Sequence, residues 1–125
     1  AYSGQTNIPR TVLNMSSGAA QRPVDGWAAY CASKAALNSL SETAQKEQDL
    51  RNSGVRIRAL APGVVDTAMQ AHIRTAEVGR FSEQAKFAGY HAEGQLQTPE
   101  AVAERIVEWL QRPSQDNENV VLRLL

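Results

Sequence analysis

The chain has 125 residues, with 13 Lys or Arg and 13 Asp or Glu, so its formal net charge is zero. This balance argues against nucleic acid or an anionic membrane as a partner held by bulk charge. The length suits one domain with its own core. The single cysteine, Cys31, excludes an intrachain disulfide and fits a reducing compartment such as the cytoplasm. No apolar run approaches the roughly 20 residues of a membrane span.

The first elements expected along the chain are a strand and a loop. Residues 11–15 form a short apolar run, which is typical of a buried parallel strand. Residues 16–26 contain Pro23 and the pair Asp25-Gly26, which interrupt regular structure. We therefore expect Ser17 to lie in a loop directly after the strand.

A long helix should follow this loop. Residues 27–52 are rich in Ala, Leu, Glu, Gln and Lys, which favour helix. Leu37, Leu40 and Ala44 fall on one face of that helix and are its expected apolar side. Gly54 suits the position just past its end.

The next strand is expected at residues 55–61, and it stops at Pro62-Gly63. In open α/β sheets, ligands bind beyond the carboxyl ends of the strands. Ser17 and Pro62-Gly63 each follow a predicted strand. If the two strands are parallel, these residues lie on the same rim of the sheet.

The remainder of the chain predicts two more helical segments and a strand. Residues 67–94 read as interrupted helix, and a lid over the site or an ordinary packed helix explains them equally well. Thr98 and Pro99 begin a clear helix as its N-cap and first turn. Residues 120–122 read as a final strand. The order β-α-β-α-β predicts half of a doubly wound α/β fold.

The expected buried stripe of this last helix has four members at helical spacing. They are Val102, Ile106, Trp109 and Leu110.

Candidate chemistry lies in Ser17, Tyr30 and Lys34. Tyr30 and Lys34 are four residues apart, so on a helix they share a face. A positive charge beside a phenol favours its ionised form, which would otherwise be scarce near neutrality. A serine hydroxyl after the preceding strand can hold a carbonyl oxygen. The three residues together predict an acid–base site that reduces C=O or oxidises C–OH.

This combination resembles the short-chain dehydrogenase/reductase family. The likeness is carried by the strand followed by Ser-Ser, the thirteen residues from Ser17 to Tyr30, and Lys34. The run G-W-A-A-Y-C-A-S-K-A-A is similar to the branch of sepiapterin reductase and bacterial benzil reductase. The resemblance implies that Tyr30 is the general acid/base, that Lys34 assists it and binds the nicotinamide ribose, and that Ser17 orients the substrate carbonyl.

The family's loop pattern P-G-x-x-x-T is matched by residues 62–67. The resemblance implies that this loop binds the cofactor together with Tyr30 and Lys34. Its cofactor-binding residues are Pro62, Gly63, Val65 and Thr67, of which the Val65 backbone and the Thr67 hydroxyl bind the nicotinamide carboxamide. The implied cofactor is NADP, with NAD as the alternative. The implied substrate is a small ketone or dicarbonyl.

The resemblance covers only the second half of the family's fold. The sequence has no G-x-x-x-G-x-G phosphate loop, so we expect residues 1–125 to be the catalytic half of an NAD(P)-binding Rossmann-like domain without its N-terminal dinucleotide-binding half. Because the helix that carries tyrosine and lysine commonly pairs between subunits in this family, the resemblance also implies a homo-oligomer. The alternative is a truncated, non-catalytic half that acts only as an association module.

Overall fold

The computed structural model describes residues 8–63, 97–113 and 118–124. The interrupted helix expected at 67–94 lies outside them. The described elements are strand β1 (Arg10–Met15), 3₁₀ helix η1 (Gly18–Ala20), helix α1 (Ala28–Leu50), strand β2 (Val55–Ala61), helix α4 (Pro99–Gln111) and strand β3 (Val121–Arg123). These bounds differ from the expected ones by one or two residues, and η1 adds one turn to the predicted loop.

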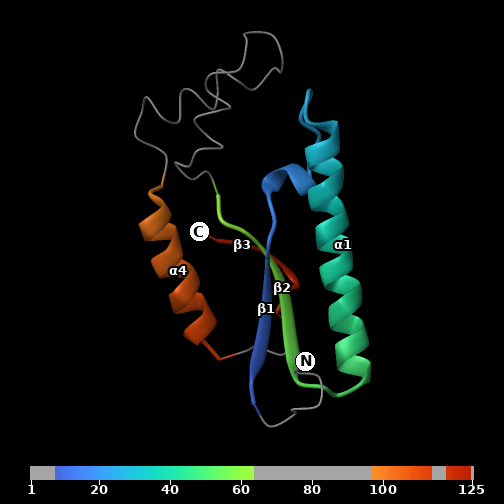
Figure 1. Ribbon diagram of the computed structural model, residues 1–125, viewed down its shortest axis with the longest axis vertical. Helices are drawn as coiled ribbons and strands as arrows, with labels where there is room; N and C mark the ends of the chain where they lie inside the picture. Colours follow the sequence, from blue (N-terminus) through green and yellow to red (C-terminus); the bar gives the residue numbers. More distant parts are fainter. Residues whose placement is uncertain (1–7, 64–96, 114–117, 125) are drawn as a thin grey trace.

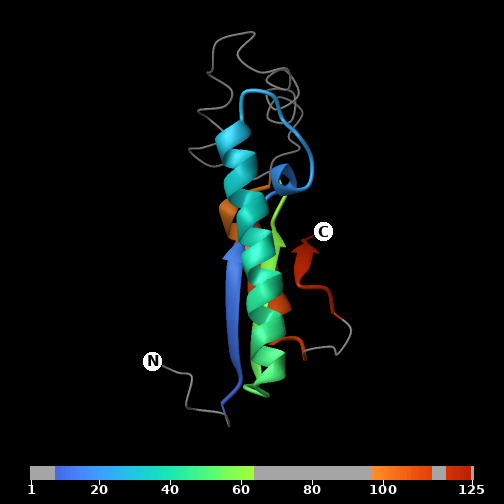
Figure 2. The ribbon, with the colours of Figure 1, turned by 90° about the vertical axis from the view of Figure 1, so that its right-hand side faces the viewer.

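The three strands form one parallel sheet in the order β1-β2-β3. Arg10 of β1 pairs with Val55 of β2, and Ala59 of β2 pairs with Val121 of β3. Helix α1 covers one face of the sheet and α4 stands on the other (Figures 1 and 2). The expected α/β architecture with a parallel β-α-β-α-β order is therefore confirmed.

Strand β1 is exposed on one side, although its apolar run is typical of a buried strand. It lies at the edge of the sheet, and among the described residues no strand pairs with its outer side. Val12 and Met15 are 46% and 41% exposed. An apolar run predicts a buried strand only where other elements cover both faces and both edges. The central strand β2 meets that condition better, and its Ala59 and Leu60 are almost fully buried.

The buried face of α1 is polar rather than apolar. Leu40, which we expected on the packed side, is 62% exposed, whereas Asn38, Ser41 and Gln45 are buried. Helical periodicity groups residues into faces, but side-chain partners decide which face packs. Here the polar face finds hydrogen-bond partners on the strands, and such partners remove the cost of burying polar groups.

Gln45 illustrates this packing, because its amide takes the place of a strand. The Ala59 N–H donates to Val120 O toward β3, so the Ile57 N–H points to the same side, beyond the start of β3. There the Gln45 side chain accepts from the Ile57 N–H and donates to Val55 O. It thus satisfies two backbone groups that β3 is too short to reach.

The two ends of α1 agree only in part with those expected from the sequence. Trp27 precedes its first turn without a side-chain capping bond. At the other end, Asn52 takes the left-handed conformation with φ of 52°, and Gly54 follows with φ of 75°. The left-handed residue next to the C-cap is therefore Asn52, since a short polar side chain tolerates this conformation.

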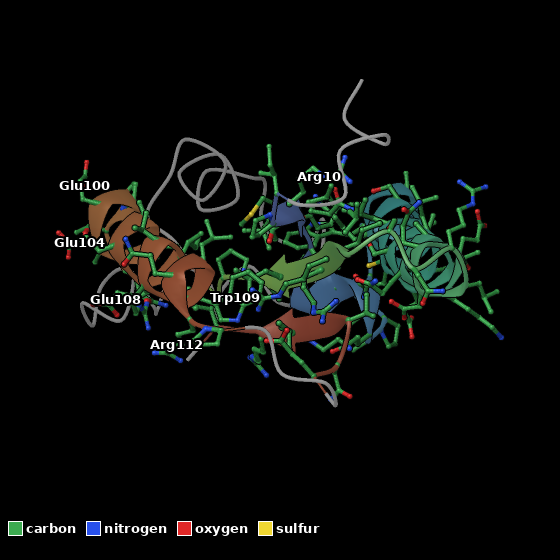
Figure 3. All side chains as sticks on the ribbon, turned by 90° about the horizontal axis from the view of Figure 1, so that it is seen from below. Arg10, Glu100, Glu104, Glu108, Trp109 and Arg112 are labelled. Carbon is green, nitrogen blue, oxygen red and sulfur yellow. The ribbon has the colours of Figure 1, made fainter. Side chains whose placement is uncertain are left out.

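Helix α4 begins as predicted and buries part of the predicted stripe. The Thr98 hydroxyl accepts from the Ala101 N–H at 3.1 Å, and Pro99 is in the first turn. Val102 is buried, and Trp109 points toward the sheet while Glu104 points away (Figure 3). Leu110 is exposed, so its assignment to the buried stripe was wrong. It lies one residue beyond Trp109, which takes the sheet-facing position.

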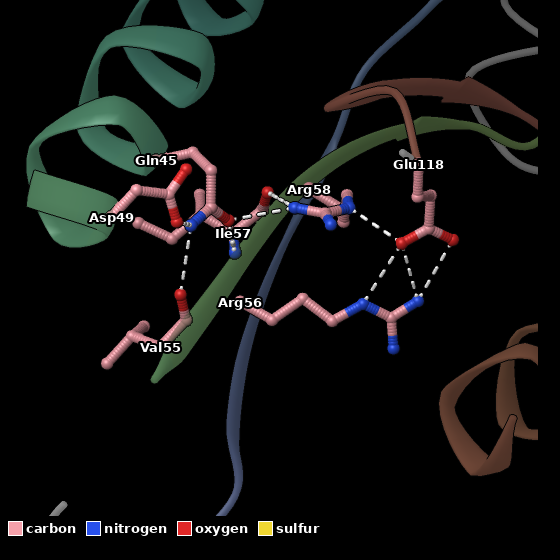
Figure 4. A network of polar contacts seen from close by, with 7 residues as sticks. All are labelled: Gln45, Asp49, Val55, Arg56, Ile57, Arg58 and Glu118. Carbon is pink, nitrogen blue, oxygen red and sulfur yellow. Dashed lines mark hydrogen bonds and ion pairs between the residues drawn. The ribbon is translucent and has the colours of Figure 1, made fainter. Parts of the chain in front are cut away.

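An ionic network ties β2 to the segment before β3 (Figure 4). Glu118 accepts from Arg56 at 2.9 Å and from Arg58 at 2.8 Å. Arg58 also donates to Gln45 Oε1 at 2.8 Å, which connects the network to α1. The Arg56 guanidinium stacks on the Trp109 ring, 4.2 Å from its centroid, and so reaches α4. This network joins four elements at the end of the sheet opposite Ser17.

The charge of Glu118 should make stability depend on acid pH. Partial burial by itself would raise the pKa of Glu118, but hydrogen bonds and positive charge from Arg58 and Arg56 hold it below the ordinary value of 4.5. A lowered folded-state pKa stabilises the fold above the ordinary value, and this stabilisation is lost as pH falls through the folded pKa. We expect Glu118→Gln to flatten the fall in thermal midpoint below about pH 4.5. If the thermal midpoints of Glu118→Gln and of the unchanged protein fall equally as pH is lowered, this expectation is wrong.

Candidate functional site

The candidate site begins at the turn after β1. The Ser16 N–H donates to Leu60 O at 2.8 Å, which ties the turn to the end of β2. Ser17 is half-buried and caps η1, because its hydroxyl oxygen accepts from the Ala19 N–H at 3.2 Å. Accepting this bond does not use the hydroxyl hydrogen, so Ser17 can still donate to a ligand oxygen.

A small apolar cluster holds η1 against the start of α1. Ala19 and Val24 are buried, and Trp27, Tyr30 and Cys31 pack on them. The Trp27 and Tyr30 rings meet edge to face with centroids 5.5 Å apart. Trp27 thus covers the start of the helix and supports Tyr30. These contacts hold η1 beside the start of α1, at the carboxyl end of β1 (Figure 1).

Lys34 lies where the spacing places it, on the same face of α1 as Tyr30. Its ammonium is 5.7 Å from the centroid of the Tyr30 ring. It also donates to Met15 O at 2.9 Å, and Met15 is the last residue of β1. The predicted approach of these two side chains is therefore confirmed. Lys34 connects the tyrosine helix with the strand end that leads into Ser16 and Ser17.

The loop after β2 lies on the same rim. Because β1 and β2 are parallel, their carboxyl ends coincide, as expected for Ser17 and Pro62-Gly63. Gly63 has φ of 90°, which residues with a side chain rarely adopt, and a Cβ there would lie 3.0 Å from Gln97 Nε2. The φ angle is the stronger reason for glycine here, because the Gln97 side chain is flexible at its far end. Val65 and Thr67 lie outside the described residues, so their predicted roles remain predictions.

Gly63→Ala should therefore destabilise the protein by about 1–2 kcal/mol, the cost of a left-handed residue with a Cβ. The matched control is Gly18→Ala in η1, because a Cβ at Gly18 meets nothing within 4 Å and its φ is ordinary. Urea unfolding of both variants in the complete gene product measures the difference. Equal stability of the two variants would show that the Gly63 conformation is not strained by a side chain.

Sequence reasoning missed three residues of this region: Ser16, Asn38 and Gln97. The Ser16 hydroxyl donates to Asn38 Oδ1, and both side chains are buried. A sequence signal existed for Asn38, because it lies four residues after Lys34 on the same face of the helix. The place of Gln97 beside Gly63 comes from the fold alone, since more than thirty residues separate them.

A family model described as "short chain dehydrogenase" matches residues 9–78, which include the whole candidate rim. The chain belongs to this family. The resemblance stated from the sequence is confirmed, as is the likeness to the branch of benzil and sepiapterin reductases.

Curated relatives support the same branch. Benzil reductase ((S)-benzoin forming) from Bacillus cereus is 39% identical over 105 residues, which are 84% of this chain and 42% of that protein. Sepiapterin reductase from Rattus norvegicus is 34% identical over 113 residues, which are 90% of this chain and 41% of that protein. The chain thus spans less than half the length of these relatives.

A solved structure has the same fold. The KRED1-Pglu enzyme superposes with a TM-score of 0.78 and 34% identity, covering 90% of this chain and 46% of that one. Among the described residues, no helix is long and apolar enough to cross a membrane. The same part of the chain contains no group of three or more His, Cys, Asp or Glu residues that could hold a metal ion.

The described rim fits the nicotinamide end of a dinucleotide. The carboxyl ends of parallel strands are the usual place for such ligands. Lys34 presents a cation at the end of β1, where a dinucleotide would lie. The sequence supplies no glycine-rich cradle for the pyrophosphate, so the fit applies to this end of the cofactor only.

Proposed function

We propose that this chain is the catalytic half of a nicotinamide-dependent carbonyl reductase that acts on a ketone or dicarbonyl. The observation that carries the proposal is Lys34, whose ammonium lies over the Tyr30 ring and binds the strand end before Ser17. Lys34 thereby links the Tyr30 ring to the strand end that leads into Ser17, which supports a shared role for the three residues. The relative from Bacillus cereus is a benzil reductase, and benzil is a dicarbonyl, which supports a substrate of this class.

The proposed roles follow from the chemistry of the three groups. Ser17 donates to the carbonyl oxygen and orients it, and Tyr30 gives a proton to that oxygen. The charge of Lys34 stabilises the phenolate that Tyr30 leaves behind. NADPH, or NADH as the alternative, supplies the hydride when bound. We assign Pro62, Gly63, Val65 and Thr67 to the loop that holds the nicotinamide carboxamide.

The whole activity requires more than the residues described. We propose that a dinucleotide-binding half completes the domain, since the relatives are more than twice as long as the region matched. We further propose a cytoplasmic homo-oligomer that binds a small carbonyl substrate, without nucleic acid or membrane as a partner.

Hydride transfer can be tested directly in the complete gene product. The protein is mixed with benzil and NADPH or NADH that carries deuterium at C4 of the nicotinamide. We expect deuterium on the carbinol carbon of the product, detected by mass spectrometry. If no ketone or dicarbonyl in a panel takes up deuterium from either cofactor, the proposal fails.

A non-catalytic association module is the second candidate, and exposed apolar side chains favour it. Leu40 on α1 and Val12 on β1 are well exposed, and β1 is an open edge among the described strands. Self-association without deuterium transfer would support this candidate. Light scattering on the same sample measures the association.

Lys34→Ala should weaken cofactor binding about tenfold to a hundredfold, which corresponds to loss of one hydrogen bond from a charged group. Isothermal titration of the complete gene product with NADPH and NADH measures the change. Lys46→Ala is the matched control, because Lys46 lies on the exposed side of the same helix. Unchanged cofactor affinity in Lys34→Ala would remove Lys34 from the cofactor site.

A further inference from the structure

Three side chains on one face of α1 bind the end of β1 and the residue that follows it. Lys34 donates to Met15 O at 2.9 Å, and Ser41 Oγ accepts from Asn14 Nδ2 at 2.9 Å. Between them, Asn38 accepts from the Ser16 hydroxyl. Positions 34, 38 and 41 follow helical spacing, so they form one line of contacts along the strand.

Apart from its Lys34 end, this line is deeply buried. Ser41, Ser16 and Asn38 are 0%, 6% and 8% exposed. Buried polar groups are costly unless they are paired, and their hydrogen bonds are directional. Apolar side chains would tolerate a shift of the helix along the strand, whereas a shift by one residue would break these bonds. The line therefore fixes where α1 lies relative to the end of β1.

Ser16 is held on two sides at the point where β1 ends. Its N–H donates to Leu60 O, and its hydroxyl donates to Asn38, so both the sheet and α1 fix it. Ser17 is the next residue, and Tyr30 lies two turns before Asn38 on the helix. The Ser16–Asn38 bond thus joins the serine turn to the helix of the tyrosine through two buried side chains.

We propose that Ser16 and Asn38 are a positioning pair that holds the Ser17 hydroxyl in place relative to Tyr30 during carbonyl reduction. The inference rests on the proposed function. Neither residue touches the reacting groups, and both act through the placement of Ser17. Misplacement of a reacting group by about 1 Å can cost on the order of a hundredfold in rate.

The test uses Ser16→Ala, Asn38→Leu and the double variant in the complete gene product. Each change should lower kcat about tenfold to a hundredfold, with KM and cofactor affinity within about threefold. Because the two residues act through one bond, the double variant should lose no more than the larger single loss. Ser41→Ala is the matched control: it loses a buried bond one turn farther from Ser17, and its kcat should stay within about threefold.

Amide hydrogen exchange gives a readout that does not depend on activity. Asn38→Leu should speed exchange of the Ser16 and Ala19 N–H groups by about tenfold or more, while Ser41→Ala should leave them unchanged. A catalytic loss in Asn38→Leu without faster exchange, or faster exchange without a catalytic loss, overturns the pair. The pair is also overturned if the loss of kcat in the double variant equals the product of the two single losses.

The two proposals fail in different ways. If the unchanged protein transfers deuterium to a carbonyl but Asn38→Leu keeps normal kcat, only the positioning pair is rejected. If the unchanged protein transfers no deuterium to any carbonyl, the proposed function is rejected and the catalytic role of the pair falls with it.

Discussion

Tyr30→Phe is expected to lower kcat for carbonyl reduction about a hundredfold to ten-thousandfold, the usual contribution of a general acid. The phenylalanine ring can keep the contact with Trp27 and the packing on Ala19, so the fold should lose little stability. Only the Tyr30 hydroxyl, the proposed proton donor, is removed. The measurement is steady-state turnover of benzil in the complete gene product, with urea unfolding of the same samples.

Cys31→Ala is the matched control for this experiment. Cys31 adjoins Tyr30 and packs on the same cluster, but it has no part in the proposed chemistry. Its kcat should stay within a few-fold of the unchanged protein. If Tyr30→Phe also stays within a few-fold, Tyr30 is not the acid, whereas a loss in Cys31→Ala alone would point to the thiol instead.

Glu118→Ala is expected to destabilise the protein by about 3 kcal/mol, in the range found when one partner of a buried ion pair is removed. The substitution leaves the guanidinium groups of Arg56 and Arg58 without their shared carboxylate in a largely buried place. Urea unfolding of the complete gene product measures the change. Since the network lies at the far end of the sheet from Ser17, kcat of the folded protein should be unchanged.

Glu104→Ala supplies the comparison. Glu104 lies on the exposed side of α4 and points away from the sheet (Figure 3), so its loss should change stability by less than about 0.5 kcal/mol. Similar losses for the two variants would mean that the Glu118 network contributes no more than an exposed charge.

The start of α4 and the placement of Tyr30 and Lys34 on one helical face were predictable, because both depend on neighbouring residues in the sequence. A capping hydroxyl at Thr98 followed by proline starts a helix in almost any context. The spacing of Tyr30 and Lys34 likewise puts them on one helical face before any tertiary contact forms. The approach of Lys34 to Tyr30 follows from this spacing.

The packed side of α1 and the burial of β1 could not be predicted in the same way. Leu40 is more apolar than Asn38, yet Asn38 is buried because Ser16 lies opposite it. Val12 belongs to an apolar run, yet it is exposed because β1 lies at the sheet edge. Ser16 decides the first outcome, and the order of the strands in the sheet decides the second.

The sequence by itself determined the order of strands and helices, the helix start at Thr98, and the placement of Tyr30 and Lys34 on one face. These features depend on neighbours within a few residues, whose geometry the backbone dictates. Only the tertiary structure decided that Lys34 binds the end of β1, that Gln97 lies beside Gly63, and that Asn38 holds Ser16. Such pairings depend on where the chain brings distant segments together, and parallel strands must be joined by long crossovers before they can form.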